Sequence, residues 1–225
     1  MSDILLQAKG IQKSFKKGKL LIPVLRDVDF AVAKGETVAI VGASGAGKST
    51  LLHILGTLDE PSSGKVFFSG RDVFSGSEEA RCEFRNRHLG FVFQFHYLLP
   101  EFTALENVMM PGLIAGRDEK YLKAGAEELL SEVGLAHRLN HRPGELSGGE
   151  SQRVAVARAL LMKPDVILGD ELTGNLDSEN SSNLISLLLE LNRKRGVSLV
   201  IVTHDVSLAR RMSRVVEIRD GRLVV

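Results

Sequence analysis

A glycine-rich segment at residues 42–50 has the residue types and the spacing of a site that binds phosphate. It reads Gly-Ala-Ser-Gly-Ala-Gly-Lys-Ser-Thr and matches the pattern G-x-x-x-x-G-K-[ST]. Small residues let backbone N–H groups curve around an anion, and the start of a following helix adds partial positive charge. In such a loop Lys48 would reach the β- and γ-phosphates, and the Ser49 hydroxyl would be a ligand of Mg²⁺. The segment therefore predicts a site for a nucleoside triphosphate.

The residues on either side of this segment predict the strand and the helix that a phosphate loop requires. Residues 36–41 are a short apolar run rich in β-branched side chains, which is typical of a buried strand. After the loop, Leu51, Leu52 and Leu55 fall on one face of a predicted helix. A glycine-rich turn that matches the pattern by accident is the alternative, and the flanking elements count against it. The candidate binding residues are Gly42, Ala43, Ser44, Gly45, Ala46, Gly47, Lys48, Ser49 and Thr50.

A second group of candidates lies where two apolar strands are predicted to end. Residues 166–171 end in Asp170 and Glu171, and residues 197–203 are followed by His204. Because unpaired buried charge is costly, two carboxylates at the end of a buried strand indicate a function. Asp170 would help to hold Mg²⁺, and Glu171 would orient an attacking water. A lone histidine is usually a bystander, but the carboxyl edge of a parallel sheet is where ligands bind.

Two other features each leave two interpretations open. Ser147 and Glu150 fit the capping box S-x-x-E at the start of a helix predicted over 147–163, which is a local structural role. The same helix end presents the free N–H groups of Gly148 and Gly149 to any nearby anion, and both roles can hold together.

Aromatic residues near the predicted loops are the second such feature. Phe15 precedes the basic turn at 16–19 and is either ordinary core or a ring that stacks on a nucleobase. The presence of a phosphate loop favours the stacking ring. Residues 95–102 are either a buried loop or an exposed patch that receives a partner.

Composition and charge argue against several classes of protein. The 29 basic and 28 acidic residues nearly cancel, so no nucleic-acid partner is expected. The single cysteine, Cys82, excludes an internal disulfide. No apolar run approaches the roughly 20 residues that cross a bilayer, and the N-terminus lacks the features of a signal peptide. We therefore expect a soluble, cytoplasmic chain that needs a separate partner for any membrane role.

The remaining patterns predict an α/β protein of one domain over residues 1–225. Residues 4–32 alternate in short stretches and predict antiparallel strands, and residues 215–224 predict a hairpin that turns at Asp220-Gly221. Further strands are predicted at 65–69 and 89–94, and further helices at 77–88, 119–133 and 179–195.

The order of these motifs resembles the ATP-binding subunits of ABC transporters along essentially the whole chain. After the phosphate loop come a strand-end Gln94, Leu-Ser-Gly-Gly-Glu at 146–150, the pair Asp170-Glu171, Asn-Leu-Asp at 175–177, and His204. The Leu-Ser-Gly-Gly motif discriminates, because many other ATPases share a P-loop.

That resemblance implies a P-loop NTPase fold with a RecA-like core, an antiparallel β subdomain and an α-helical subdomain. The core and the β subdomain would comprise 1–94 and 161–225, and the helical subdomain about 95–160. It also implies a homodimer with ATP at the interface. Ser147, Gly148 and Gly149, together with Glu150, would bind the γ-phosphate held by the opposite subunit.

The resemblance implies a role for each remaining candidate as well. Phe15 is similar to the ring that stacks on adenine, and Asp177 to the D-loop residue at the nucleotide. Gln94 resembles the glutamine that contacts Mg²⁺ and water and couples to the membrane subunit. Glu171 resembles the catalytic base and His204 the switch histidine. Lys48 and residues 42–50 resemble the Walker A motif, and Asp170 the Mg²⁺ ligand of Walker B.

Within the family, residues 93–108, 141–143 and 209–222 are most similar to ATPases of lipoprotein-releasing systems. Macrolide-exporter-type ATPases share parts of these stretches. The resemblance implies a peripheral subunit at the cytoplasmic face of the inner membrane that binds transmembrane permease subunits through about residues 94–102. Alternatives are a macrolide or peptide exporter, a division-linked signalling complex and a soluble ABC ATPase acting on nucleic acid.

Two positions depart from the family pattern. Leu172 stands where the family usually has proline after the catalytic glutamate. The absence of proline is expected to loosen the base. Glu150-Ser151 stands where Gln-Gln is common and places a negative charge near a phosphate site. Hydrolysis is therefore expected to be intact but slow.

Overall fold

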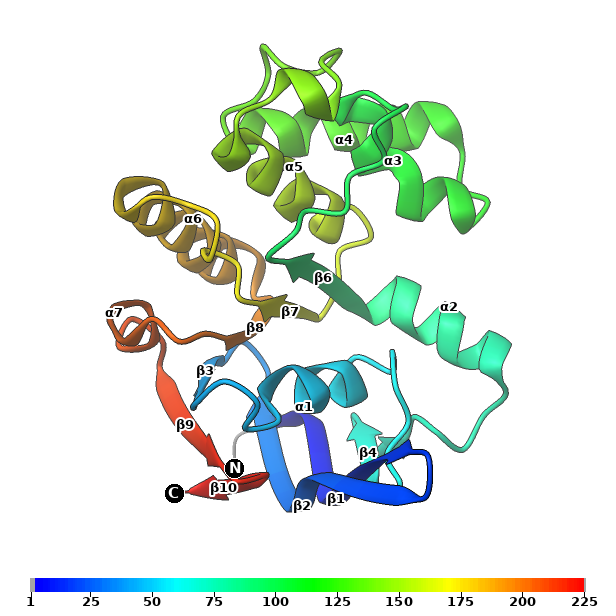
Figure 1. Cartoon of the computed structure of the whole chain (residues 1–225). Coiled ribbons are helices and arrows are strands. Elements are labelled where there is room, and N and C mark those ends of the chain that lie inside the picture. The colour runs from blue at the N-terminus through cyan, green and yellow to red at the C-terminus, as the bar shows by residue number, and fades with distance from the viewer. Residues whose placement is uncertain (1–2, 225) are drawn as a thin grey trace.

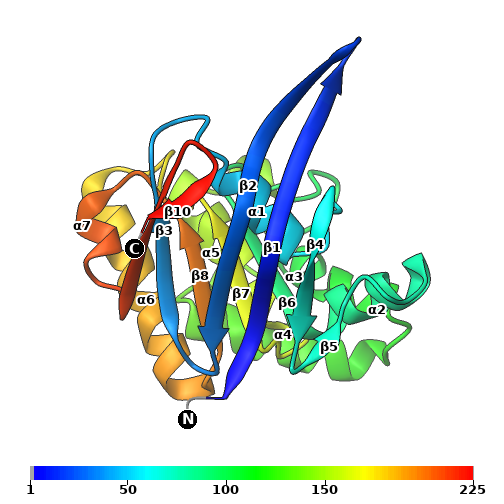
Figure 2. The ribbon, with the colours of Figure 1, turned by 90° about the horizontal axis from the view of Figure 1, so that it is seen from below.

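An antiparallel sheet forms one layer of the computed structural model, which describes residues 3–224. Its strand order is β2-β1-β4-β5, and the pairing of β1 with β2 confirms the antiparallel strands expected over 4–32. The β1–β2 hairpin projects far beyond the rest of the molecule (Figure 2). The strands are β1 (Ile4–Lys17), β2 (Leu20–Ala33), β4 (Ser63–Phe68) and β5 (Arg71–Asp72).

The second sheet has the order β10-β9-β3-β8-β7-β6 and is parallel except at β10. Its central strands are almost entirely apolar, because both faces of the sheet are covered. All parallel strands end at the same edge, so the loops after β3, β6, β7 and β8 meet there. The strands are β3 (Thr37–Val41), β6 (Leu89–Phe93), β7 (Val166–Asp170), β8 (Ser198–Val202), β9 (Arg214–Arg219) and β10 (Arg222–Val224).

Helix α1 (Lys48–Leu55) lies between the two sheets, where Leu51, Leu52 and Leu55 are fully buried as the sequence predicts. In Figure 1 the opposite side of the parallel strands carries α6 (Ser178–Arg195), beside which lies the short α7 (Val206–Ala209). Helix α2 (Glu78–His88) leads into β6 along the surface, as expected for residues 77–88.

A group of three helices occupies the top of Figure 1, comprising α3 (Ala104–Ile114), α4 (Glu119–Glu132) and α5 (Gly148–Leu160). Asp118 caps α4, which was predicted over 119–133, by accepting a hydrogen bond from the Tyr121 N–H. Helix α5 ends earlier than predicted, because Lys163 has a positive φ of 55° just before Pro164. Among the described residues no helix is both long and apolar enough to cross a bilayer.

Candidate nucleotide-binding site

The loop between β3 and α1 can be built only with glycine at its two ends. A Cβ at Gly42 would lie 2.2 Å from the Ile218 carbonyl oxygen, and one at Gly47 would lie 2.8 Å from Leu25 Cδ2. Gly47 also has a φ of 107°, which L side chains rarely adopt. Strands β9 and β2 therefore fix the shape of the loop, which turns directly into α1.

The lysine that follows this loop is folded back over it. Lys48 is buried, and its Nζ donates hydrogen bonds of 3.0 Å to the carbonyl oxygens of Gly42 and Ala43. These bonds hold an ammonium group at the mouth of the loop, next to the start of α1. A fixed cation, free helical N–H groups and a glycine cradle are the features that bind phosphate.

Oxygen ligands lie beside this loop at the end of β7. The Ser49 hydroxyl donates to Asp170 Oδ1 over 3.0 Å. Burial raises the pKa of Asp170 above its usual value, with the hydrogen bond from Ser49 acting in the opposite direction. A partly buried carboxylate beside a hydroxyl gains from a hard cation, and both groups are ligands that Mg²⁺ accepts. These residues therefore fit a magnesium ion.

One hollow of about 420 Å³ brings several of the predicted residues together. It is lined by Ser49, Gln94, Asp170 and Glu171. Gln94 follows the end of β6, and its Nε2 donates to Asn175 Oδ1 over 3.3 Å. The tertiary fold thus places side chains from three separate loops around the space next to the phosphate loop.

The acid that follows Asp170 is paired with the predicted histidine. His204 Nδ1 lies 2.5 Å from Glu171 Oε2. Glu171 has a φ of 50°, and its N–H donates to the Val202 carbonyl over 3.0 Å. A left-handed conformation at a non-glycine residue costs of order 1–3 kcal/mol and is typical of functional sites.

Leu172 explains how this turn is held without proline. Its side chain is only 2% exposed and belongs to the main apolar core. A following proline would favour an extended backbone at Glu171, whereas the observed conformation is left-handed. Leu172 is therefore packed in the core directly after Glu171, and the expected loosening of the base stays a prediction. The rate of hydrolysis remains a prediction.

The helix end at Ser147 forms the predicted capping box. Ser147 Oγ accepts from the Glu150 N–H over 3.2 Å, and Glu150 Oε2 accepts from the Ser147 N–H over 2.8 Å. Ser147 and Gly148 are exposed. In Figure 1 the parallel strands separate α5 from α1, so this helix end does not line the phosphate loop of its own chain.

The start of α6 lies next to that helix end. A Cβ at Gly149 would be 3.2 Å from Asn180 Oδ1. Asp177 is the N-cap of α6 and accepts a hydrogen bond of 2.8 Å from the Asn180 N–H. The structure thus brings the Ser147–Glu150 segment and Asp177 into one exposed region.

The two predicted aromatic positions are both on the surface. Phe15 is 44% exposed near the tip of the β1–β2 hairpin, and Lys13 Nζ lies 5.0 Å from the centre of its ring. This excludes ordinary core for Phe15. In the 95–102 segment, Phe95 is 61% and Tyr97 65% exposed, so the segment is an exposed patch.

A groove continues from this patch and is predominantly apolar. It has a volume of about 480 Å³ and runs between α2, β6 and α3. Phe91, Phe93 and Ile114 are among the residues that line it. Tyr97 packs edge-on against Phe93, which joins the exposed patch to the groove.

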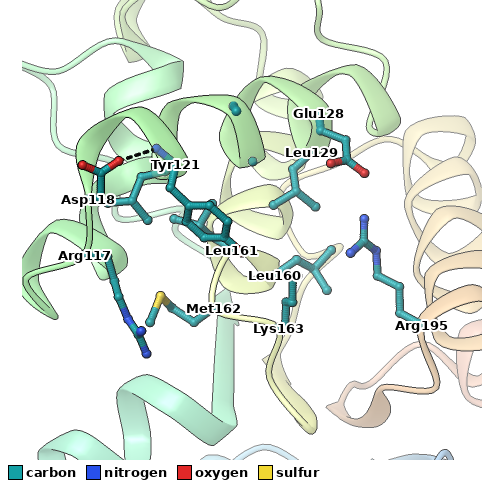
Figure 3. A pocket seen from close by; sticks show the side chains of 13 residues that line it. Arg117, Asp118, Tyr121, Glu128, Leu129, Leu160, Leu161, Met162, Lys163 and Arg195 are labelled. Atoms are coloured by element: carbon teal, nitrogen blue, oxygen red, sulfur yellow. Dashed lines mark hydrogen bonds between the residues drawn. The ribbon is translucent and has the colours of Figure 1, made fainter.

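A cavity of about 740 Å³ lies elsewhere, between α4 and the ends of α5 and α6 (Figure 3). None of the residues predicted to bind nucleotide lines it. Figure 3 shows Arg117 and Arg195 at opposite sides of it, so these cations do not converge on one anion.

Two residues near the site were missed by the sequence analysis. His53 lies on α1 with Nε2 4.0 Å from Asp170 Oδ2, and it also lines the hollow around Ser49. Its spacing of four residues from Ser49 puts both on one helix face, which was an available signal. Arg138 donates to Glu150 Oε1 over 2.8 Å, and no spacing rule links these two positions.

A family model described as ABC transporter matches residues 25–174, which contain the phosphate loop, Gln94, Ser147 and Asp170. The chain belongs to the ABC transporter family. It is one of the ATPase cassettes of that family, which bind and hydrolyse ATP. The strand order and the placement of the phosphate loop described above are the fold of this ABC cassette.

Similar proteins cover nearly the whole cassette. This chain is 58% identical over 220 residues to the lipoprotein-releasing system ATP-binding protein LolD of Geobacter metallireducens, and the match covers 98% of each chain. It is 54% identical over 225 residues to the protein of that description from Shewanella oneidensis, covering 100% of this chain and 98% of the relative.

Solved structures show the same fold. The dimeric structure of MJ0796, described as a bacterial ABC transporter cassette, matches with a TM-score of 0.91 and 38% identity, covering 98% of this chain and 97% of that one. A dimeric post-hydrolysis state of MJ0796 bound to ADP and Pi matches equally well, with a TM-score of 0.91 and 37% identity over 98% and 97% of the two chains.

Proposed function

We propose that this chain is the ATP-hydrolysing subunit of a lipoprotein-releasing ABC transporter. The observation that carries this proposal is the 58% identity to a lipoprotein-releasing LolD protein over 98% of both chains. The motifs for nucleotide chemistry alone would not separate lipoprotein release from other transport.

The proposed chemistry follows from the geometry at the carboxyl edge of the parallel sheet. Lys48 binds the β- and γ-phosphates, and Phe15 stacks on adenine. Residues 42–50 supply the N–H donors that surround the phosphates. Ser49, Asp170 and Gln94 hold Mg²⁺, which when bound neutralises phosphate charge.

Glu171 is the proposed base. Nδ1 of His204 lies 2.5 Å from its Oε2, and this contact would orient the carboxylate beside an attacking water. The Glu171 oxygen accepts the proton of that water, and His204 steadies the γ-phosphate. Positioning and electrostatics then supply most of the rate enhancement.

We further propose that two copies form a dimer with ATP between them. The exposed helix end at Ser147, Gly148 and Gly149, with Glu150 behind it, would bind the γ-phosphate held by the second copy. Asp177 lies beside this helix end and would join the same interface. The dimeric arrangement of the MJ0796 cassette supports this assignment.

The membrane partner would bind at the patch of residues 95–102 and in the adjoining groove. Exposed Phe95 and Tyr97, next to an apolar groove of about 480 Å³, suit a short apolar helix of a permease. Residues of about 95–160 would form a helical subdomain that moves with this partner. The chain would then be peripheral, at the cytoplasmic face of the inner membrane.

A glutamine at position 171 tests the assignment. Glu171→Gln should lower ATP turnover by about 10²- to 10⁴-fold while leaving ATP binding intact, because the amide cannot accept a proton. Turnover near the unmodified rate would contradict the role of Glu171. Measured turnover and nucleotide binding on purified protein decide between these outcomes.

The same variant tests the cargo. Tagged Glu171→Gln protein is trapped with ATP in its native membranes, solubilised gently, and its partners are identified. Two different permease subunits with acylated proteins attached would support lipoprotein release. A single permease species would favour a macrolide-type exporter, and the absence of any membrane partner would overturn the transport function.

A further inference from the structure

A glutamate lies directly behind the exposed helix end of α5. Glu150 belongs to the first turn, beside the N–H groups of Gly148 and Gly149. Under the proposed function those N–H groups meet a phosphate bound by a second copy. A bare carboxylate in that turn would repel the phosphate, because like charges across an interface weaken association.

A cation is paired with this carboxylate. Arg138 Nε donates to Glu150 Oε1 over 2.8 Å, while Glu150 Oε2 accepts from the Ser147 N–H. The backbone hydrogen bond from Ser147, aided by the one from Arg138, lowers the pKa of Glu150 to about 2. The glutamate is therefore ionised at neutral pH and depends on Arg138 for neutralisation.

The segment that carries Arg138 is tied to the neighbouring helix. Arg138 Nη1 lies 3.0 Å from His141 Nε2. The His141 carbonyl accepts from the Ala104 N–H over 2.8 Å, and the Leu139 carbonyl accepts from the Leu105 N–H over 3.0 Å. The segment that carries Arg138 is thus fastened to the start of α3, and its guanidinium contacts Glu150 and His141.

We propose that Arg138 is a positioning residue for the phosphate site shared between two copies, which it serves by neutralising Glu150. This inference rests on the proposed ATP-bound dimer. Arg138 touches neither nucleotide nor reacting atoms and acts through the glutamate. If Arg138 only fastened its segment to α5, its loss would weaken the dimer whether or not position 150 carried a charge.

The test measures ATP-dependent dimerisation by analytical ultracentrifugation at several salt concentrations, with Glu171→Gln as the parent so that ATP is retained. Arg138→Gln should weaken the ATP-bound dimer by about tenfold or more, because it leaves Glu150 uncompensated. Adding Glu150→Gln to that variant should restore dimerisation to within about twofold of the parent. Arg138→Lys keeps the charge and should lose only a small part of the affinity.

A matched control is available on another face. Arg195 forms a similar ion pair with Glu132, where Nη2 lies 2.5 Å from Oε2, near the C-terminus of α6. Arg195→Gln removes the same side chain from a pair distant from the helix end, and it should dimerise as the parent does.

The outcomes separate this inference from the proposed function. If the parent does not dimerise with ATP, the proposed dimer fails and the role of Arg138 fails with it. If the parent dimerises but Arg138→Gln dimerises equally well, only the inference is overturned. It is also overturned if Arg138→Gln is weak and Glu150→Gln does not rescue it.

If circular dichroism shows that Arg138→Gln is unfolded, a second variant tests the role of Arg138. Glu150→Gln alone leaves the guanidinium without its carboxylate, so the helix end gains positive charge. Its dimer with ATP should be as tight as that of the parent or tighter, with a steeper dependence on salt. A weaker dimer or an unchanged salt dependence would overturn the inference.

Discussion

At the scale of single residues, the partner of a side chain decides what its charge does. Glu150 appeared in the sequence as a negative charge near a phosphate site, and in the structure it is paired with Arg138. Leu172 stands in place of the expected proline, and in the structure its side chain is buried in the apolar core. Both effects come from contacts that the local sequence does not contain.

Ionised Asp170 lowers the stability of the folded chain, and this effect can be measured. Burial raises the pKa of this carboxyl, so the folded state favours the protonated form more than the unfolded state does. The folded chain therefore loses stability as pH rises from the ordinary aspartate range, and the loss is complete once the pH exceeds the raised pKa. We expect Asp170→Asn to raise the melting temperature of the nucleotide-free protein at pH 7 and to abolish Mg²⁺-dependent hydrolysis.

Thermal melts of both proteins between pH 3 and pH 8, without nucleotide or metal, check this expectation. The difference in melting temperature should be small at the acid end and grow as pH increases. A difference that stayed constant across this range, or that reversed in sign, would contradict it.

At the scale of helices and strands, local sequence patterns predicted the positions of most elements. Tertiary packing determined where those elements end. Asp118 and Asp205 cap the helices that follow them, a position that favours aspartate. Strand β6 stops at Phe93, one residue before the predicted end, so Gln94 lies in the loop. Near its other end, β6 approaches α5 closely.

The contacts around Gly90 show how closely β6 approaches α5. A Cβ at this position would lie 2.6 Å from the Ala159 carbonyl oxygen and 3.2 Å from Pro164 Cγ. We expect Gly90→Ala to force β6 and α5 apart and to lower the free energy of unfolding by about 1–3 kcal/mol. Chemical denaturation measures this change.

Gly125 in α4 is the matched control, because a Cβ there would meet only Leu161 Cδ1 at 3.6 Å, an ordinary contact. Gly125→Ala should stabilise the protein by about 0.5–1 kcal/mol through better helix propensity. Equal effects of the two substitutions would show that packing at Gly90 is not tight.

At the scale of the whole molecule, one group of exposed apolar residues lies along and beside a groove. Ile114 is 76% exposed at the end of α3 and lines the groove that continues from the 95–102 patch. An aspartate there would place a charge in the proposed permease interface. We expect Ile114→Asp to lower recovery of the membrane partner by tenfold or more, about the effect of losing one interface anchor.

Tyr121→Asp provides the comparison, since Tyr121 is 65% exposed but lines the cavity of Figure 3 instead. Partner recovery from detergent-solubilised membranes, together with the ATPase rate of the isolated chain, distinguishes the two variants. Loss of partner in both variants, or in neither, would argue against docking at this groove.

Much of this protein was determined by its sequence, because the signals are local. The phosphate loop needs residues 42–50 in order, and a capping box needs only Ser147 and Glu150. Apolar runs placed the strands β3, β7 and β8 because strands covered on both faces carry few polar residues. The family resemblance added the roles of residues such as Gln94, which no local signal assigns.

Tertiary structure alone decided which distant groups meet. It joined Glu171 to His204, Asp170 to Ser49 and Glu150 to Arg138, each across a loop or a sheet. It also showed that Phe15 and the 95–102 segment are exposed, where the sequence left core and surface both open. Charge pairing and burial depend on distances between elements, and a chain fixes those distances only when its sheets and helices pack.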